Sequence, residues 1–262
     1  MIIKNLPFDE YRSMPQVNFS TLKFMAQSPK HYLYNLENPK EPTIAMALGN
    51  LIHCIVLEPL EVLNRYAIMP DIDRRTKIGK EKYEEFINKS IGKIAIKDEQ
   101  YKEAFAIAQT VPRLYELTTE TTFTGILENI DVKCRVDAYD IDNENKVITV
   151  YDLKTTREAS ESKFKWSIEN YYYHVQAAFY VNIMRQQKEF SGYNIKYQII
   201  AVETQTPYDY TNWDLGYMAI DVGREIYTSW LLKVNEANFS NVYQGYPKEP
   251  IVFHPKENNY GR

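Results

Sequence analysis

Three charged residues in the second half of the chain have the types and spacing for hydrolysis of a phosphodiester bond. Asp152 and Lys154 lie two apart in a segment typical of a strand, so their side chains share one face. A short turn at 142–145 leads back to a preceding strand that carries Asp137. Carboxylates bind hard divalent cations, and a lysine can orient the attacking water and offset charge on phosphate. The alternative interpretation is a surface hairpin with three solvated charges.

A histidine in the first half of the chain favours the catalytic interpretation. His53 lies in the middle of an apolar segment, 44–58, whose pattern predicts a buried helix. Helical side chains lean toward the N-terminus, so His53 lies over Gly49, which leaves room for an imidazole or a metal ion. Taken alone, a hydrogen-bonded core histidine is the simpler explanation.

A tyrosine-rich run from 171 to 180 supplies a third group of polar side chains. Gln176 and Tyr180 are four apart and share a helix face, and Tyr173 falls on the same face. An amide and phenols in this arrangement could contact a substrate backbone. The alternative is an aromatic stripe that packs in the core, which we favour for Tyr172 and Phe179.

A fourth feature is a basic loop with a glycine, at 73–80. Its four cations fall within seven residues: Arg74, Arg75, Lys77 and Lys80. Such a cluster can hold the phosphates of a nucleic acid. The alternative is a solvated charge cluster with no ligand.

Composition and missing motifs exclude several other classes of protein. Among the 262 residues, 31 Lys and Arg face 35 Asp and Glu, giving a net charge of −4, so nucleic-acid binding would depend on local basic patches. The nine glycines form neither a dinucleotide-binding nor a P-loop fingerprint. The two cysteines, Cys54 and Cys134, cannot supply a disulfide framework or an all-cysteine zinc or iron–sulfur site. We expect a cytoplasmic protein, because neither a signal peptide nor a membrane-spanning stretch is apparent.

The pattern along the chain predicts one domain of α/β class. Residues 1–112 are expected to be mainly helical, and residues 113–262 to form an α/β core. Ser20 and Ser28 are predicted N-caps of two short helices, and a polar loop is expected over 70–80. Further helices are predicted over 80–89, 98–110, 163–187 and 216–237, and strands over 121–127, 132–140, 146–153 and 195–204.

Taken together, these motifs resemble one family over nearly the whole chain. The order is Gly49…His53, Asp137, Asp152-Leu153-Lys154-Thr155-Thr156 and Tyr173…Gln176…Tyr180. It looks like the RecB-like branch of the PD-(D/E)xK nucleases, above all the RecE-type (exonuclease VIII-like) recombination exonucleases of phages and prophages. The resemblance implies a restriction-endonuclease-like core, in which a central mixed β-sheet is flanked by helices. Val136 departs from the proline that this family often has before the first aspartate.

The resemblance also implies roles for residues of this chain. The metal ligands would be His53, Asp137, Asp152 and the backbone carbonyl of Leu153. Lys154 would be the catalytic lysine, and Gln176 and Tyr180 would support the site and the DNA backbone. An upstream acid is expected as well, for which Glu120 has the better spacing and Glu128 is the rival.

The implied activity is a metal-dependent exonuclease that degrades linear double-stranded DNA. It would proceed 5′ to 3′ and leave a 3′ single strand for a single-strand annealing protein, and the enzyme would form a ring-like homo-oligomer around DNA. Mg²⁺ is the expected metal, with Mn²⁺ as an option because an imidazole ligand softens the site. The alternatives are an endonuclease on the same fold and a non-catalytic DNA-binding protein, although the latter would be expected to have lost Asp137, Asp152 or Lys154.

Overall fold

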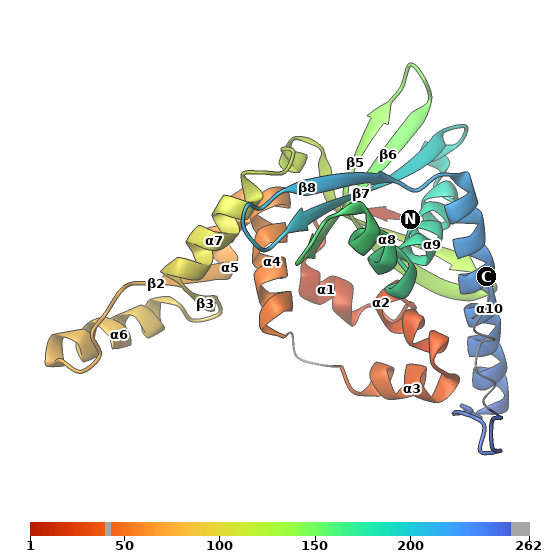
Figure 1. The fold of residues 1–262 in the computed structure, drawn as a ribbon, viewed down its shortest axis with the longest axis horizontal. Coiled ribbons are helices and arrows are strands. Elements are labelled where there is room, and N and C mark those ends of the chain that lie inside the picture. Colours follow the sequence, from red (N-terminus) through yellow and green to blue (C-terminus); the bar gives the residue numbers. More distant parts are fainter. Residues whose placement is uncertain (40–42, 253–262) are drawn as a thin grey trace, which may run out of the picture.

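A six-stranded sheet forms the centre of the protein in the computed structural model, which describes residues 1–39 and 43–252 (Figure 1). The strands, in their order across the sheet, are β1 (Ile2–Ile3), β4 (Thr118–Leu127), β5 (Ile130–Asp142), β6 (Val147–Thr156), β7 (Asn194–Glu203) and β8 (Tyr210–Asp214). All neighbours are antiparallel except β6 and β7, which run parallel. The predicted mixed sheet flanked by helices is therefore confirmed. The short edge strands β1 and β8 were not predicted.

Helices cover both faces of this sheet and create two apolar cores. One core lies between the sheet and four helices: α2 (Phe19–Leu22), α8 (Glu161–Asn170), α9 (Tyr173–Arg185) and α10 (Tyr217–Ser240). The other lies between the opposite face and the helices α4 (Ile44–Leu57) and α7 (Asp98–Ala108). The N-terminal half thus contributes helices to both layers. Within the described residues, no helix is long and apolar enough to cross a membrane.

Side-chain caps begin several of these helices, as the sequence indicates. The hydroxyl of Ser28 accepts a hydrogen bond from the His31 N–H at the start of α3 (Pro29–Glu37), and Thr43 caps α4 in the same way. The prediction for Ser20 is wrong, because Asn18 caps α2 through the Thr21 N–H. That helix ends at Leu22 and continues as a 3₁₀ turn.

Two helices differ from their predictions, one in its extent and the other in its burial. The helix predicted over 163–187 breaks into α8 and α9 at Tyr172, whose backbone is left-handed with φ 59°. The apolar helix α4 is buried only from Gly49 onward, since Ile44 is 86% and Met46 56% exposed in its first turn. Apolar composition alone did not reveal that this turn extends past the core.

The chain between α4 and α7 forms an arm that extends away from the central sheet (Figure 1). It contains α5 (Val62–Arg65), the parallel strand pair β2 (Tyr66–Met69) and β3 (Ile94–Lys97), and α6 (Lys77–Lys89). The helix α6 starts at Lys77, earlier than predicted, because the Thr76 hydroxyl accepts from the Gly79 N–H. Gly79 allows the chain to approach itself closely: a Cβ here would lie 1.9 Å from the Asp73 carbonyl oxygen. The sequence patterns did not predict β2 and β3.

The N-terminal helix α1 (Phe8–Ser13) is fixed to β5 by two cationic side chains. Lys133 is 1% exposed and donates to the carbonyls of Tyr11 and Met14, each at 2.6 Å. Arg135 donates to the Leu6 carbonyl at 2.7 Å. Both cations therefore supply donors to carbonyls around a helix that has no buried residue of its own.

Candidate active site

The candidate site lies where β5 and β6 separate. The two strands pair from Asp142↔Val147 to Ala138↔Tyr151, and β6 continues to pair with β7 as far as Thr156↔Glu203. Beyond the last β5–β6 pair, the two strands no longer pair through their backbones. Instead, the Asp137 carboxylate accepts a hydrogen bond from the Leu153 N–H at 2.8 Å. Asp137 is thereby held against the backbone of β6, next to the motif residues on that strand.

Asp152 and Lys154 meet on the face of β6 that α9 covers. The Lys154 Nζ forms an ion pair with Asp152 Oδ2 at 2.6 Å, which confirms that the two side chains share a face. Gln176 donates to Asp152 Oδ1 at 3.3 Å, and Lys154 Nζ lies 5.1 Å from the ring centre of Tyr173. The polar groups predicted on β6 and on α9 are therefore in direct contact.

His53 reaches Asp137 from α4 on the other face. Its Nδ1 lies 3.7 Å from Asp137 Oδ2, and its side chain is 29% exposed. The helix approaches β6 closely at Gly49, where a Cβ would lie 3.0 Å from the Thr155 hydroxyl. Burial and the charge of Lys154 lower the pKa of His53, against the opposing effect of Glu120, Asp152 and the backbone of Leu153. This favours the neutral imidazole, the form that binds metal.

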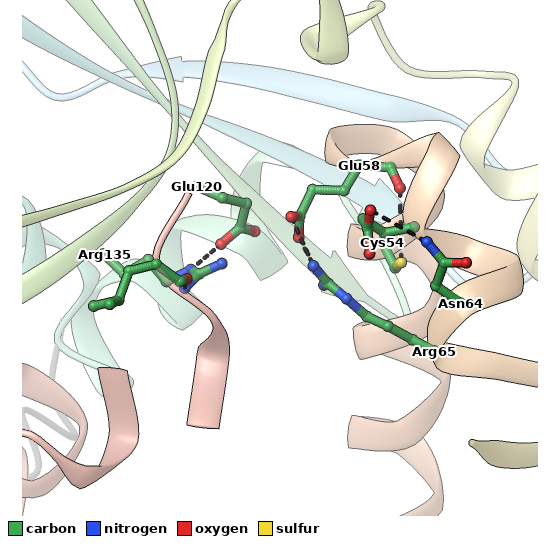
Figure 2. A network of polar contacts seen from close by, with 8 residues as sticks. Cys54, Glu58, Asn64, Arg65, Glu120 and Arg135 are labelled. Carbon is green, nitrogen blue, oxygen red and sulfur yellow. Dashed lines mark hydrogen bonds and ion pairs between the residues drawn. The ribbon is translucent and has the colours of Figure 1, made fainter. Parts of the chain in front are cut away.

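Of the two candidate upstream acids, the structure brings only Glu120 to the site. Glu120 lies between the pairs Thr119↔Ala138 and Thr121↔Val136, which places it opposite Asp137. Its backbone is left-handed at φ 49°, and its carboxylate pairs with Arg135, as Figure 2 shows. Glu128 instead lies in the β4–β5 turn, where its carbonyl accepts from Asn235.

A second ion pair faces Glu120 from the end of α4 (Figure 2). Arg65 contacts Glu58 at 2.7 Å, and Cys54 lies beside this pair. Burial raises the pKa of Glu120, with Asp137 and Glu58 acting in the same direction and Arg135 opposing them. Glu120 therefore lies beside the carboxylates of β5 and β6, close to both negative and positive charges.

The two central carboxylates are held together against their mutual repulsion. Burial, and then the charge of Asp152, raises the pKa of Asp137 to about 7, against Lys154, the Leu153 N–H and Arg135. For Lys154, burial acts to lower the pKa, but Asp152 and Asp137 outweigh it, so the pKa rises. Lys154 is consequently a fixed cation in this arrangement.

The donor atoms fit a hard divalent cation. Asp152 is 2% exposed, and its Oδ2 pairs with the Lys154 ammonium at 2.6 Å. Carboxylate oxygens, a backbone carbonyl and a neutral imidazole are atoms that such a cation binds, and Asp137, Asp152, Leu153 and His53 supply them here. In the part of the chain that the structure describes, no three His, Cys, Asp or Glu side chains converge tightly enough to form a closed cation site. The ligands would have to exchange their present partners for the metal.

The predicted DNA-binding cations do not join this cluster. They lie at the start of α6 on the arm, away from the central sheet (Figure 1), where the Arg74 guanidinium stacks 4.3 Å from the Tyr83 ring centre. Tyr180 is mostly buried at 9% exposure, and its ring lies 6.5 Å from that of Tyr197 in the core. Of the tyrosines predicted on α9, Tyr173 is the one whose ring faces the Lys154 ammonium.

Tyr197 on β7 was not predicted from the sequence. It pairs with Val150, two residues before Asp152, and is 1% exposed. Its ring lies 6.5 Å from that of Tyr180, and its hydroxyl has no hydrogen-bond partner within the described residues. Burial and then the charge of Asp152 raise its pKa. A tyrosine in an apolar strand carries no signal in the sequence that separates it from ordinary core.

The fold and this cluster define the class of PD-(D/E)xK-like proteins. The chain belongs to the family described as "PDDEXK-like domain of unknown function", whose match covers residues 18–246. It is similar to a crystal structure from Eubacterium rectale named "Putative exonuclease", with 15% sequence identity and a TM-score of 0.62 over 95% of this chain and 97% of that one. This likeness concerns the fold. No curated protein matches the chain.

Proposed function

We propose that the protein is a metal-dependent deoxyribonuclease that hydrolyses phosphodiester bonds at the Asp137–Asp152–Lys154 cluster. The observation that carries the proposal is the convergence of these three side chains where β5 and β6 separate. Burial of like charges at one place destabilises a fold, so their convergence here favours a functional role. The family and the similar exonuclease structure support the same class of activity.

The residues would divide the reaction as follows. Asp137, Asp152, the Leu153 carbonyl and His53 would hold the cation, which when bound would polarise the phosphate and acidify the attacking water. Lys154 offsets the charge that develops on the phosphate and orients the water, because its ammonium is fixed by Asp152. Gln176 holds Asp152 from α9. Arg135 keeps Glu120 next to Asp137, where it could orient a water or a second cation.

The finer activity is an exonuclease acting on ends of linear double-stranded DNA. The proposal includes 5′ to 3′ polarity, a 3′ single-stranded product passed to an annealing protein in phage-type recombination, and a ring-like homo-oligomer. The resemblance of the motifs to RecE-type exonucleases supports these points. Mg²⁺ is the proposed metal, with Mn²⁺ as a substitute.

One plasmid in two forms tests the activity. Linear and covalently closed DNA are incubated with the protein in Mg²⁺ or in EDTA. Loss of the linear form alone, and only with metal, is the expected result. Cutting of the closed circle would replace the exonuclease with an endonuclease, and no loss of either form would favour a non-catalytic DNA-binding protein.

A matched pair of lysine variants tests the site. We expect Lys154→Ala to lower the cleavage rate by about 10²- to 10³-fold, as for loss of one transition-state donor. Lys196→Ala removes an exposed lysine on the neighbouring strand β7 and should leave the rate unchanged. Melting temperatures establish whether both variants fold. Equal rates for Lys154→Ala and the wild type would refute the site.

A further inference from the structure

A row of aromatic rings leads from the catalytic lysine to the protein surface. Lys154 Nζ lies 5.1 Å from the ring centre of Tyr173, the Tyr173 and Tyr171 rings are 5.8 Å apart, and Tyr171 is 5.8 Å from Trp166. Exposure increases along the row: Tyr173 is half-buried, whereas Tyr171 and Trp166 are 51% and 55% exposed. We refer to Tyr173, Tyr171 and Trp166 as the aromatic row.

The break between α8 and α9 completes this alignment. Trp166 and Tyr171 both precede the break, on α8 and at its C-cap, and their rings lie 5.8 Å apart. In an unbroken helix, Tyr171 and Tyr173 would point about 160° apart. The left-handed residue Tyr172 turns the chain between those two residues, so the Tyr173 ring lies beside the Tyr171 ring.

The outer end of the row opens into two adjoining hollows of about 430 and 440 Å³. Trp166 and Lys163 line both hollows, and Arg157, Glu158 and Gln205 line the first. Thr156, the last residue of β6, lines it as well, so the hollow begins directly beyond the Asp152–Lys154 motif. Both hollows are open to solvent rather than enclosed, so they suit a chain that lies across the surface.

The charges at this place suit a phosphate backbone. Neither Arg157 nor Lys163 forms an ion pair within the described residues, although the chain as a whole carries a net charge of −4. The one carboxylate that lines the hollow, Glu158, accepts a hydrogen bond from the Ser160 hydroxyl. Exposed aromatic faces beside such cations are the features by which proteins bind single strands: bases stack and phosphates pair.

We infer that the aromatic row and the hollow at Trp166 bind an unpaired strand of nucleic acid next to the catalytic cluster. The inference rests on the proposed nuclease function and adds a strand-binding site to it. Stacking requires an unpaired base, because the faces of paired bases are covered in a duplex. The site therefore binds single-stranded DNA in preference to a blunt duplex.

Binding in EDTA tests this without cleavage. Anisotropy of a fluorescein-labelled dT₁₂ strand is measured with the wild type, Trp166→Ala, Trp166→Phe and the control Phe239→Ala. Phe239 is 95% exposed on α10 and belongs to no hollow described above, so its removal should leave the affinity unchanged. We expect Trp166→Ala to weaken binding by about tenfold, within the range for loss of one stacked base, and Trp166→Phe to restore most of it.

Two further measurements separate the possible outcomes. Replacing Arg157 or Lys163 by alanine should reduce the slope of log affinity against log salt by about 0.7 for each phosphate that is left unpaired. Equal dT₁₂ affinity for Trp166→Ala and the wild type would overturn the inference, as would an equal loss of affinity for a blunt duplex or an absence of dT₁₂ binding. Trp166-dependent binding of dT₁₂ without plasmid digestion would refute the nuclease and keep the strand site. Plasmid digestion with dT₁₂ binding that does not depend on Trp166 would do the reverse.

Discussion

Replacing Asp137 by asparagine tests whether the buried carboxylates destabilise the metal-free fold. Burial and repulsion from Asp152 raise the pKa of Asp137 from 3.8 to about 7. Between about pH 4 and pH 7 the folded protein therefore keeps a proton that the unfolded chain has lost. The free energy of unfolding must fall as the pH rises through this window, which is the opposite of the usual behaviour of a salt-bridged aspartate.

The magnitude follows from the two pKa values. A rise from 3.8 to about 7 corresponds to about 4 kcal/mol, and the 17% exposure of the side chain reduces the expected effect to about 2–4 kcal/mol. Asparagine has nearly the same shape, and its oxygen can still accept the Leu153 N–H. We expect Asp137→Asn to be more stable than the wild type by this amount at pH 8, and the difference to vanish near pH 4.

Urea unfolding in EDTA at pH 4, 6 and 8 measures the difference. Asp140→Asn is the control, because Asp140 is an exposed carboxylate on the same strand. Added Mg²⁺ should then stabilise the wild type and not Asp137→Asn, since only the wild type retains the full ligand set. A variant that is less stable at pH 8, or equally stabilised at every pH, would refute the reasoning.

Three further substitutions test other features of the fold. Gly79→Ala places a Cβ against the Asp73 carbonyl and should loosen the start of α6, measured as faster proteolysis within the arm; unchanged proteolysis would contradict the close approach. Lys133→Met leaves the carbonyls of α1 without their donor and should lower stability by about 1–3 kcal/mol in urea unfolding, whereas an unchanged midpoint would show that water replaces the ammonium. Tyr197→Phe removes a hydroxyl that has no partner within the described residues and should leave the melting temperature unchanged or raised; a clear decrease would reveal a hidden partner.

The candidate cluster could be predicted because its geometry is mostly local. Asp137, Asp152 and Lys154 belong to two strands joined by a short turn, so strand period and hairpin pairing alone place them together. His53 was harder to place, since its position depends on how α4 packs across the sheet. The resemblance of motifs, rather than any pattern around His53, supplied that long-range contact.

The features that were missed depend on tertiary contacts. The break at Tyr172 lies in a tyrosine run with no glycine or proline, so no local signal ends the helix there. The strands β2 and β3 pair with each other around α6, and such a short parallel pair has little periodicity to detect. Asn18 rather than Ser20 caps α2 because both types are good caps and only the entry angle of the chain decides between them.

The arrangement of the site across two layers has a consequence for the order of folding. The β5–β6 hairpin closes a short loop and can form early, whereas α4 and the crossover through α8 and α9 must join over much longer stretches of chain. In the isolated hairpin, Asp137 and Asp152 remain hydrated and have neither His53 nor Gln176 beside them. On the proposed function, a half-folded or nascent chain would carry the acidic motif without cutting activity, and DNA in the cell would meet an active nuclease only after both layers had docked.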